Sequence, residues 1–182
     1  MSNIGLLLLR ATAGGLLAGH GAQKLFGWFG GYGLKGTAGW LESMGLKPGQ
    51  LWATGASVSE FGGGVLTTLG LLHPIGPIAT LGAMSMAVAK AHWGKPIWVT
   101  EGGAELPVTN LAVALALALN GPGPYSLDRA FGIRVPRAIV ALVLAVEAGI
   151  TVMGIVAHPT PPPQTENHAG AELEGGKGAE TF

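Results

Sequence analysis

The chain has no cysteine and few charged residues, and both shortages narrow what it can do. The lack of cysteine excludes thiol–disulfide chemistry, Cys-ligated zinc and iron–sulfur clusters. Only 11% of the 182 residues are charged, whereas a soluble domain carries about 25%. The formal net charge is zero and no nucleic-acid-binding motif is present, so nucleic acid is not expected as a partner.

Long apolar runs take the place of the missing charge. Hydrophobic residues make up 48% of the chain, and the mean hydropathy is +0.45. A helix needs about 20 mostly apolar residues to cross a bilayer. The sequence predicts five transmembrane helices, over residues 4–25, 52–72, 75–93, 106–120 and 135–157. We therefore expect an all-α, multi-pass protein of the lipid bilayer.

The remaining segments divide the chain further. Thr37 to Met44 is predicted to form a short interfacial helix, with Thr37 as its cap and Gly45 as its stop. From His158 onward the chain is rich in Pro, Glu and Gly, which predicts a disordered tail. Lysines after the first and third helices favour an amino terminus on the outer side of the membrane. The expected units are a four-helix domain over 1–130, an added helix over 131–157 and the tail over 158–182.

Five ionisable residues lie inside or at the rim of the apolar segments: His20, Lys24, Glu60, Lys90 and His92. A charge at the centre of a membrane helix costs about 2.5–3.5 kcal/mol, so a chain that keeps such charges usually pairs or uses them. Because the chain reverses after each helix, a rise of about 1.5 Å per residue places all five in one leaflet. We expect Glu60 to lie opposite Lys24 or His20, with His92 closing the third side.

These residues supply the candidate sites. The predicted catalytic residues are His20, Lys24, Glu60 and His92, and the predicted cofactor-binding residues are His20, Glu60, His92 and Asn110. No metal site is predicted. The competing interpretation is an ion pair that only holds the helices together, with lysines reaching the headgroups.

Two further features concern packing. Gly15 and Gly19 are four residues apart and predict a face for close helix contact. Glu147 in the last helix is expected either to pair with Arg10 or to mark an oligomer contact.

Several short motifs occur in an order that resembles the DoxX family of small membrane proteins. They are HGAQKLFG from His20 to Gly27, EFGG from Glu60 to Gly63, LGL at 69–71, Met86-Ala87 leading to His92, and GPG with SLD between 121 and 128. The resemblance implies a four-helix membrane bundle in the plasma membrane of a bacterium or archaeon. The family is named from the small subunits of a membrane thiosulfate:quinone oxidoreductase, and other members are linked to membrane oxidoreductase assemblies. The fifth helix and the acidic tail depart from this pattern.

The leading functional hypothesis is a membrane subunit of a quinone-linked redox complex. His20, Lys24, Glu60 and His92 would supply proton donors, and electrons would come from a soluble or membrane redox partner, because no flavin or metal motif is present. Three alternatives stay open: a non-catalytic scaffold subunit, a transporter of protons or small solutes, and, less favoured, a b-type haem held by His20 and His92. Whether the chain is catalytic and whether it forms an oligomer are also left open.

Overall fold

The computed structural model describes residues 3–157, and in this range every regular element is helical. Seven α-helices follow one another with three short helical turns between them. Their bounds are α1 (Asn3–Phe26), η1 (Trp28–Gly30), α2 (Gly33–Ser43), α3 (Gly49–Leu69), α4 (Ile75–Met86), η2 (Ala87–Ala91), η3 (Val99–Glu101), α5 (Glu105–Asn120), α6 (Leu127–Phe131) and α7 (Arg137–Val156). The all-α prediction is confirmed for these residues, and the predicted tail over 158–182 lies outside them.

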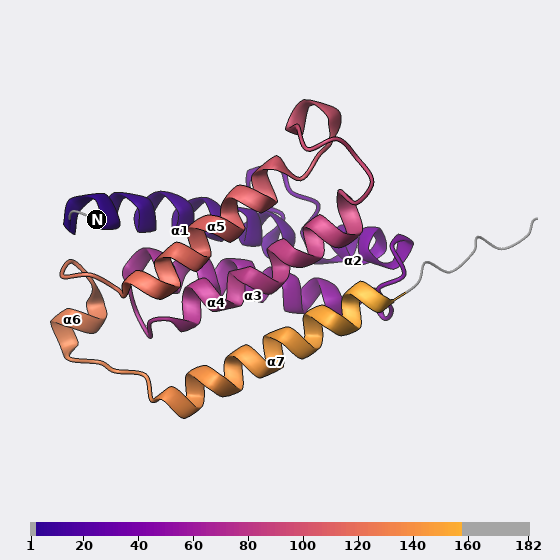
Figure 1. The fold of residues 1–182 in the computed structure, drawn as a ribbon. Coiled ribbons are helices and arrows are strands. Elements are labelled where there is room, and N and C mark those ends of the chain that lie inside the picture. The colour runs from indigo at the N-terminus through magenta and orange to yellow at the C-terminus, as the bar shows by residue number, and fades with distance from the viewer. Residues whose placement is uncertain (1–2, 158–182) are drawn as a thin grey trace, which may run out of the picture.

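Five long helices run roughly parallel or antiparallel to one another (Figure 1). They are α1, α3, α4 with its π-helical extension η2, α5 and α7, and each coincides with one of the predicted segments. We call the end with the start of α1, the α3–α4 turn and α6 the A end. The B end holds α2, the end of α1 and the end of α7. The chain reversal assumed from the sequence is therefore present.

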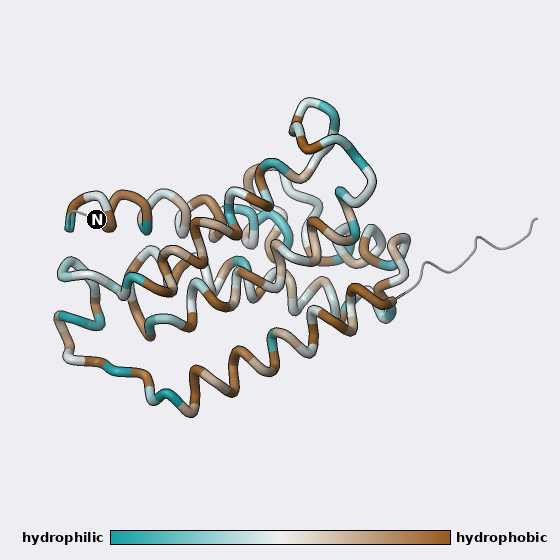
Figure 2. Tube along the Cα trace, viewed as in Figure 1, coloured by the Kyte–Doolittle hydropathy of each residue, from teal (hydrophilic) through white to brown (hydrophobic). Residues whose placement is uncertain are grey.

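Two of these helices are long and apolar enough to cross a membrane, namely α1 and α7. Figure 2 shows hydrophobic residues along the whole length of α7. The α4–η2 helix and α5 are apolar but shorter. α3 has 21 residues, but its serines, threonines, glycines and Glu60 make it less apolar. Length and composition thus support membrane crossing for α1 and α7, and the four-plus-one transmembrane bundle stays a prediction.

The short helix α2 begins earlier than predicted. It starts at Gly33, and Thr37 lies inside it, where the Thr37 hydroxyl donates to the Gly33 carbonyl at 2.8 Å instead of capping the helix. Leu41 and Ala38 of α2 pack with Ala53 of α3 in a small buried cluster. This packing compensates for the two glycines in the first turn, which lower the intrinsic helix propensity.

Close packing of α1 on α3 depends on glycines, but not on the pair that the sequence suggested. A Cβ atom on Gly14 would lie 2.7 Å from the Gly64 carbonyl oxygen, and one on Gly21 would lie 2.2 Å from the Phe61 nitrogen. Gly15 and Gly19 have no atom within 4 Å of such a Cβ. The predicted packing face was therefore wrong by a rotation about the helix axis, and Gly14 and Gly21 form the contact.

The same contact makes a clear prediction for α3. Replacing Gly64 with alanine would place its Cβ 2.4 Å from the Ala18 nitrogen, so we expect a loss of about 1–3 kcal/mol in unfolding free energy. Gly62 is the matched control, because a Cβ there meets open space and alanine favours a helix. Thermal unfolding in detergent should rank Gly62→Ala at or above wild type and Gly64→Ala well below it. Equal stabilities would contradict the glycine-mediated contact.

Candidate functional site

The close crossing of α1 and α3 brings two of the predicted site residues together. Gly21 lies against the backbone of Phe61, and one turn later the Lys24 ammonium forms an ion pair with Oε1 of Glu60. The Glu60 side chain is 3% exposed and that of Lys24 is 31% exposed. The Glu60 carboxylate is therefore buried, while Lys24 can still reach the surface.

The second oxygen of Glu60 is left without a partner. Oε2 is buried and accepts no hydrogen bond from any residue in the described range 3–157. A buried carboxylate oxygen without a donor costs free energy, typically about 1–3 kcal/mol or more for a charged group. Such an oxygen is available to a proton or to a donor group on a ligand.

Glu60 and Lys24 line a cavity of about 330 Å³ at the B end. The cavity, called the B-end cavity below, is enclosed by α2, α3, the α4–η2 helix and α7, with Lys24 from α1. Its wall is mostly apolar, with residues such as Leu41, Trp52, Met86 and Met153. A largely apolar cavity with a few convergent polar groups is the usual form of a small-molecule site.

Two more charged residues reach the B-end cavity. Glu147 of α7 places its carboxylate against Gly82 of α4, where a Cβ would lie 1.8 Å from Oε1. Lys90 lines the same cavity, and its ammonium donates to the Ala157 carbonyl. The expected pair of Glu147 with Arg10 does not form, because Arg10 binds backbone carbonyls at the A end.

The other predicted site residues lie outside the cavity wall. His20 is exposed and its Nδ1 lies 3.1 Å from Oε1 of Gln23. His92 has Nδ1 2.7 Å from the Gly102 carbonyl, so it holds the loop between η2 and α5. Asn110 of α5 donates to the Met84 sulfur at 3.7 Å. The structure thus brings Lys24 and Glu60 together and gives His20, His92 and Asn110 other contacts.

Within residues 3–157 no group of three or more His, Asp and Glu side chains is arranged to hold a metal ion. The B-end cavity still contains two carboxylates and two ammonium groups from four different elements. These groups can bind protons and form hydrogen bonds with a ligand.

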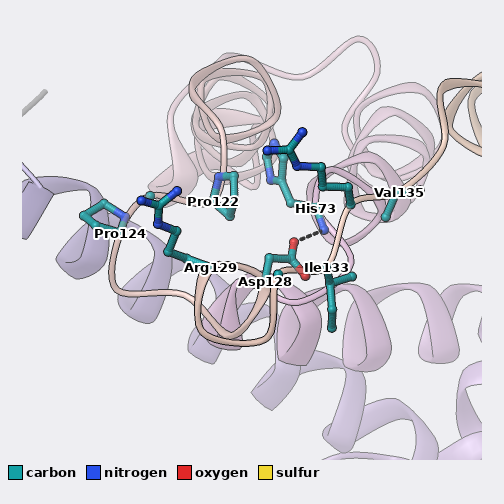
Figure 3. Close-up of a pocket in the computed structure, with 10 residues that line it drawn as sticks. His73, Pro122, Pro124, Asp128, Arg129, Ile133 and Val135 are labelled. Carbon is teal, nitrogen blue, oxygen red and sulfur yellow. Dashed lines mark hydrogen bonds between the residues drawn. The ribbon is translucent and has the colours of Figure 1, made fainter.

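A second polar cluster, at the A end, was missed by the sequence reasoning. The carboxylate of Asp128 accepts a hydrogen bond from the backbone N–H group of Leu72 at 2.8 Å. It accepts a second one from the backbone N–H group of His73 at 2.7 Å (Figure 3). Arg10 is 4% exposed and donates to the carbonyls of Thr68, Pro122 and Tyr125. Together these bonds fasten the 121–132 segment to the α3–α4 turn. The only signals in the sequence were an arginine within an apolar run and the SLD motif.

His73 in the α3–α4 turn gives a pH-dependent prediction. Burial lowers the pKa of its imidazole, against smaller raising effects of the Ala118 carbonyl and Asp128. The neutral ring donates from Nε2 to that carbonyl at 3.1 Å. Because the unfolded chain binds the proton more readily, folding stability should be full above about pH 6.5 and fall as the pH drops below it.

Thermal unfolding of wild type and His73→Gln from neutral to mildly acidic pH measures this effect. The wild-type melting temperature should fall more steeply with acidification than that of His73→Gln, which keeps a donor but does not titrate in this range. Parallel pH profiles would show that His73 titrates alike in the folded and unfolded chain.

Comparisons with known proteins agree with the motifs. Residues 5–93, from α1 to just beyond η2, match the model of the DoxX family. A search of curated proteins found no match, and neither did a search of solved structures. The matched region contains Lys24, Glu60 and Lys90 of the B-end cavity but not Glu147. Over residues 5–93, the chain is therefore similar to the DoxX family of membrane proteins.

Proposed function

We propose that this chain is a membrane subunit of a redox complex and binds a quinone in the B-end cavity. The observation that carries the proposal is the unpartnered Oε2 of Glu60, a buried carboxylate oxygen in the wall of a mostly apolar cavity. A quinone has an apolar ring and tail, which match such a wall, and the hydroxyl groups of its reduced, quinol form can donate to Oε2. Among the predicted site residues only Lys24 and Glu60 line this cavity, and the assignment rests on them.

The chemistry requires protons from the protein and electrons from elsewhere. Reduction of a quinone to a quinol takes up two electrons and two protons. The electrons would come from a partner redox protein, since residues 3–157 hold no arranged metal site and the sequence shows no flavin motif. The Lys24–Glu60 pair would hold and pass the protons, with Lys24 as the partly exposed end and Glu60 as the buried end.

The proposal includes a multi-pass arrangement in which all five long helices cross the plasma membrane. Two features support it. Exposed aromatic residues gather in and beside the loops and short helix of the B end, where a belt of Trp and Tyr would meet the headgroups. These residues are Trp28, Phe29, Tyr32, Trp40, Trp93 and Trp98. α7 also exposes apolar side chains over most of its length, including Leu142, Val146 and Met153.

Quinone binding by the purified full chain in nanodiscs tests the function. We expect wild type to bind a short-tailed ubiquinone or menaquinone analogue in its quinol form, whose hydroxyl groups can donate to Oε2 of Glu60. Glu60→Gln should bind it about tenfold more weakly, because a neutral amide oxygen accepts a weaker hydrogen bond than a charged carboxylate does. Glu101→Gln is the matched control, since Glu101 is an exposed carboxylate outside the cavity.

Two results would overturn the assignment. Absence of quinone binding by wild type would refute quinone as the ligand. Equal binding by wild type and Glu60→Gln would refute the assignment of the site to Glu60. Retention of a redox partner by a chain that binds no quinone would instead favour the scaffold hypothesis.

A further inference from the structure

A larger cavity of about 580 Å³ lies at the A end. The 121–135 segment forms most of its wall, and His73 of the α3–α4 turn forms the rest (Figure 3). The charged side chains around it are those of Arg129, Arg134 and Asp128. This A-end cavity shares no lining residue with the B-end cavity.

The charge that the A-end cavity offers to a ligand is positive. Both carboxylate oxygens of Asp128 already accept backbone N–H groups, one from Leu72 and one from His73. The guanidinium groups of Arg129 and Arg134 are exposed and form no ion pair or hydrogen bond with any residue in the described part of the chain. Two arginines without an acidic partner therefore line this cavity. The carboxylate of its one acidic residue, Asp128, is already hydrogen-bonded to backbone N–H groups.

The rest of the wall is apolar or is backbone. Pro122, Pro124, Ile133 and Val135 line the cavity beside the arginines. An amphiphilic ligand with an anionic head and an apolar body matches this division better than a small inorganic ion does. A guanidinium binds two oxygens of a phosphate in parallel, and two guanidinium groups can share one phosphodiester.

The position of the cavity along the bundle indicates the source of such a ligand. It lies where α3 turns into α4 and just before α7 begins at Arg137. In the multi-pass arrangement proposed above, on which this step rests, the ends of these helices lie at the depth of the lipid headgroups. In the turns of α7 that follow Arg137, Ile139 and Leu142 are exposed, and acyl chains can lie along them.

We infer that the A-end cavity is a binding site for the phosphate of an anionic phospholipid. Arg129 and Arg134 bind the phosphate oxygens, and the apolar wall contacts the glycerol and the first acyl carbons. The bound lipid bridges the 121–135 segment and the start of α7, so it stabilises the folded chain by mass action.

The test is thermal unfolding of the full chain in phosphatidylcholine nanodiscs with and without phosphatidylglycerol. We expect phosphatidylglycerol to raise the melting temperature of wild type and to leave that of Arg129→Gln/Arg134→Gln unchanged. Native mass spectrometry should show about tenfold weaker retention of the lipid for each arginine removed. Lys35→Gln/Lys47→Gln removes two exposed positive charges at the B end and should keep the full response.

A second arm separates the lipid from a soluble anion. Inorganic phosphate at matched ionic strength should shift the melting temperature little, because it lacks the apolar part. A phosphate shift as large as that of phosphatidylglycerol would overturn the lipid assignment in favour of a soluble oxyanion. A response that survives in the double arginine variant, or one lost equally in the lysine variant, would overturn the site. Quinone binding plays no part in this measurement, so the two proposals can fail separately.

Discussion

Replacing Arg10 with glutamine should lower the unfolding free energy by about 3–5 kcal/mol. Arg10 is 4% exposed and is the donor to three backbone carbonyls, those of Thr68, Pro122 and Tyr125. A glutamine amide is shorter and has two donors, so at least one carbonyl loses its partner in a buried place. The change also releases the 121–126 segment from α3. Reversible unfolding in mixed micelles measures the loss.

Arg10→Lys separates charge from geometry. Lysine keeps the positive charge, but a single ammonium cannot reproduce the planar fork that reaches three carbonyls. We therefore expect a loss between those of wild type and Arg10→Gln. Lys35→Gln, at an exposed position of α2, is the surface control and should change stability by less than about 0.5 kcal/mol. A loss below about 1 kcal/mol for Arg10→Gln would show that the three bonds contribute little.

The second large effect concerns the buried ion pair. Lys24→Met should cost about 2–3 kcal/mol, because it leaves the Glu60 carboxylate buried without a cation. We place the value below the usual range for breaking buried pairs because Lys24 is partly exposed. Glu60→Gln should cost less, since the Lys24 ammonium left behind can turn to solvent or to the headgroups.

The double variant Lys24→Met/Glu60→Gln should recover most of the loss. With the carboxylate replaced by a neutral amide, the missing cation no longer leaves a buried charge, and the four stabilities form a double-mutant cycle. A coupling free energy near zero would mean that the pair makes no net contribution to stability.

Depth along the helices could be predicted from the sequence, but rotation about their axes could not. The reversal of the chain and a rise of 1.5 Å per residue place Lys24 and Glu60 at the same end of the bundle, and the two side chains do meet. The same count places His20 at that end as well, yet His20 points to Gln23 and is exposed. Gly15 and Gly19 failed as a packing face for the same reason, since Gly14 lies one position away and offers an equally small face.

Contacts between segments far apart in the sequence were the other feature that could not be predicted. The bonds from Asp128 to the amides of Leu72 and His73 join residues more than fifty positions apart, and no spacing rule connects them. α2 began earlier than expected because its packing against α3 outweighs the glycines of its first turn. The helices themselves were predictable, because long apolar runs broken by Gly and Pro leave few other choices.

The packing of α7 has a consequence for the rates at which a ligand enters and leaves the B-end cavity. α7 packs mainly against α4, whereas α1 and α3 interlock through glycines on both helices. Yet α7 contributes Glu147, Ile150 and Met153 to the wall of the B-end cavity. Because α7 is held mainly by α4, the α7 side of the B-end cavity is the part of its wall that can separate from the bundle at the lowest free-energy cost. Entry and departure of a ligand would then be timed by α7 leaving α4, so the residence time of the ligand would depend on a helix outside the 5–93 family region.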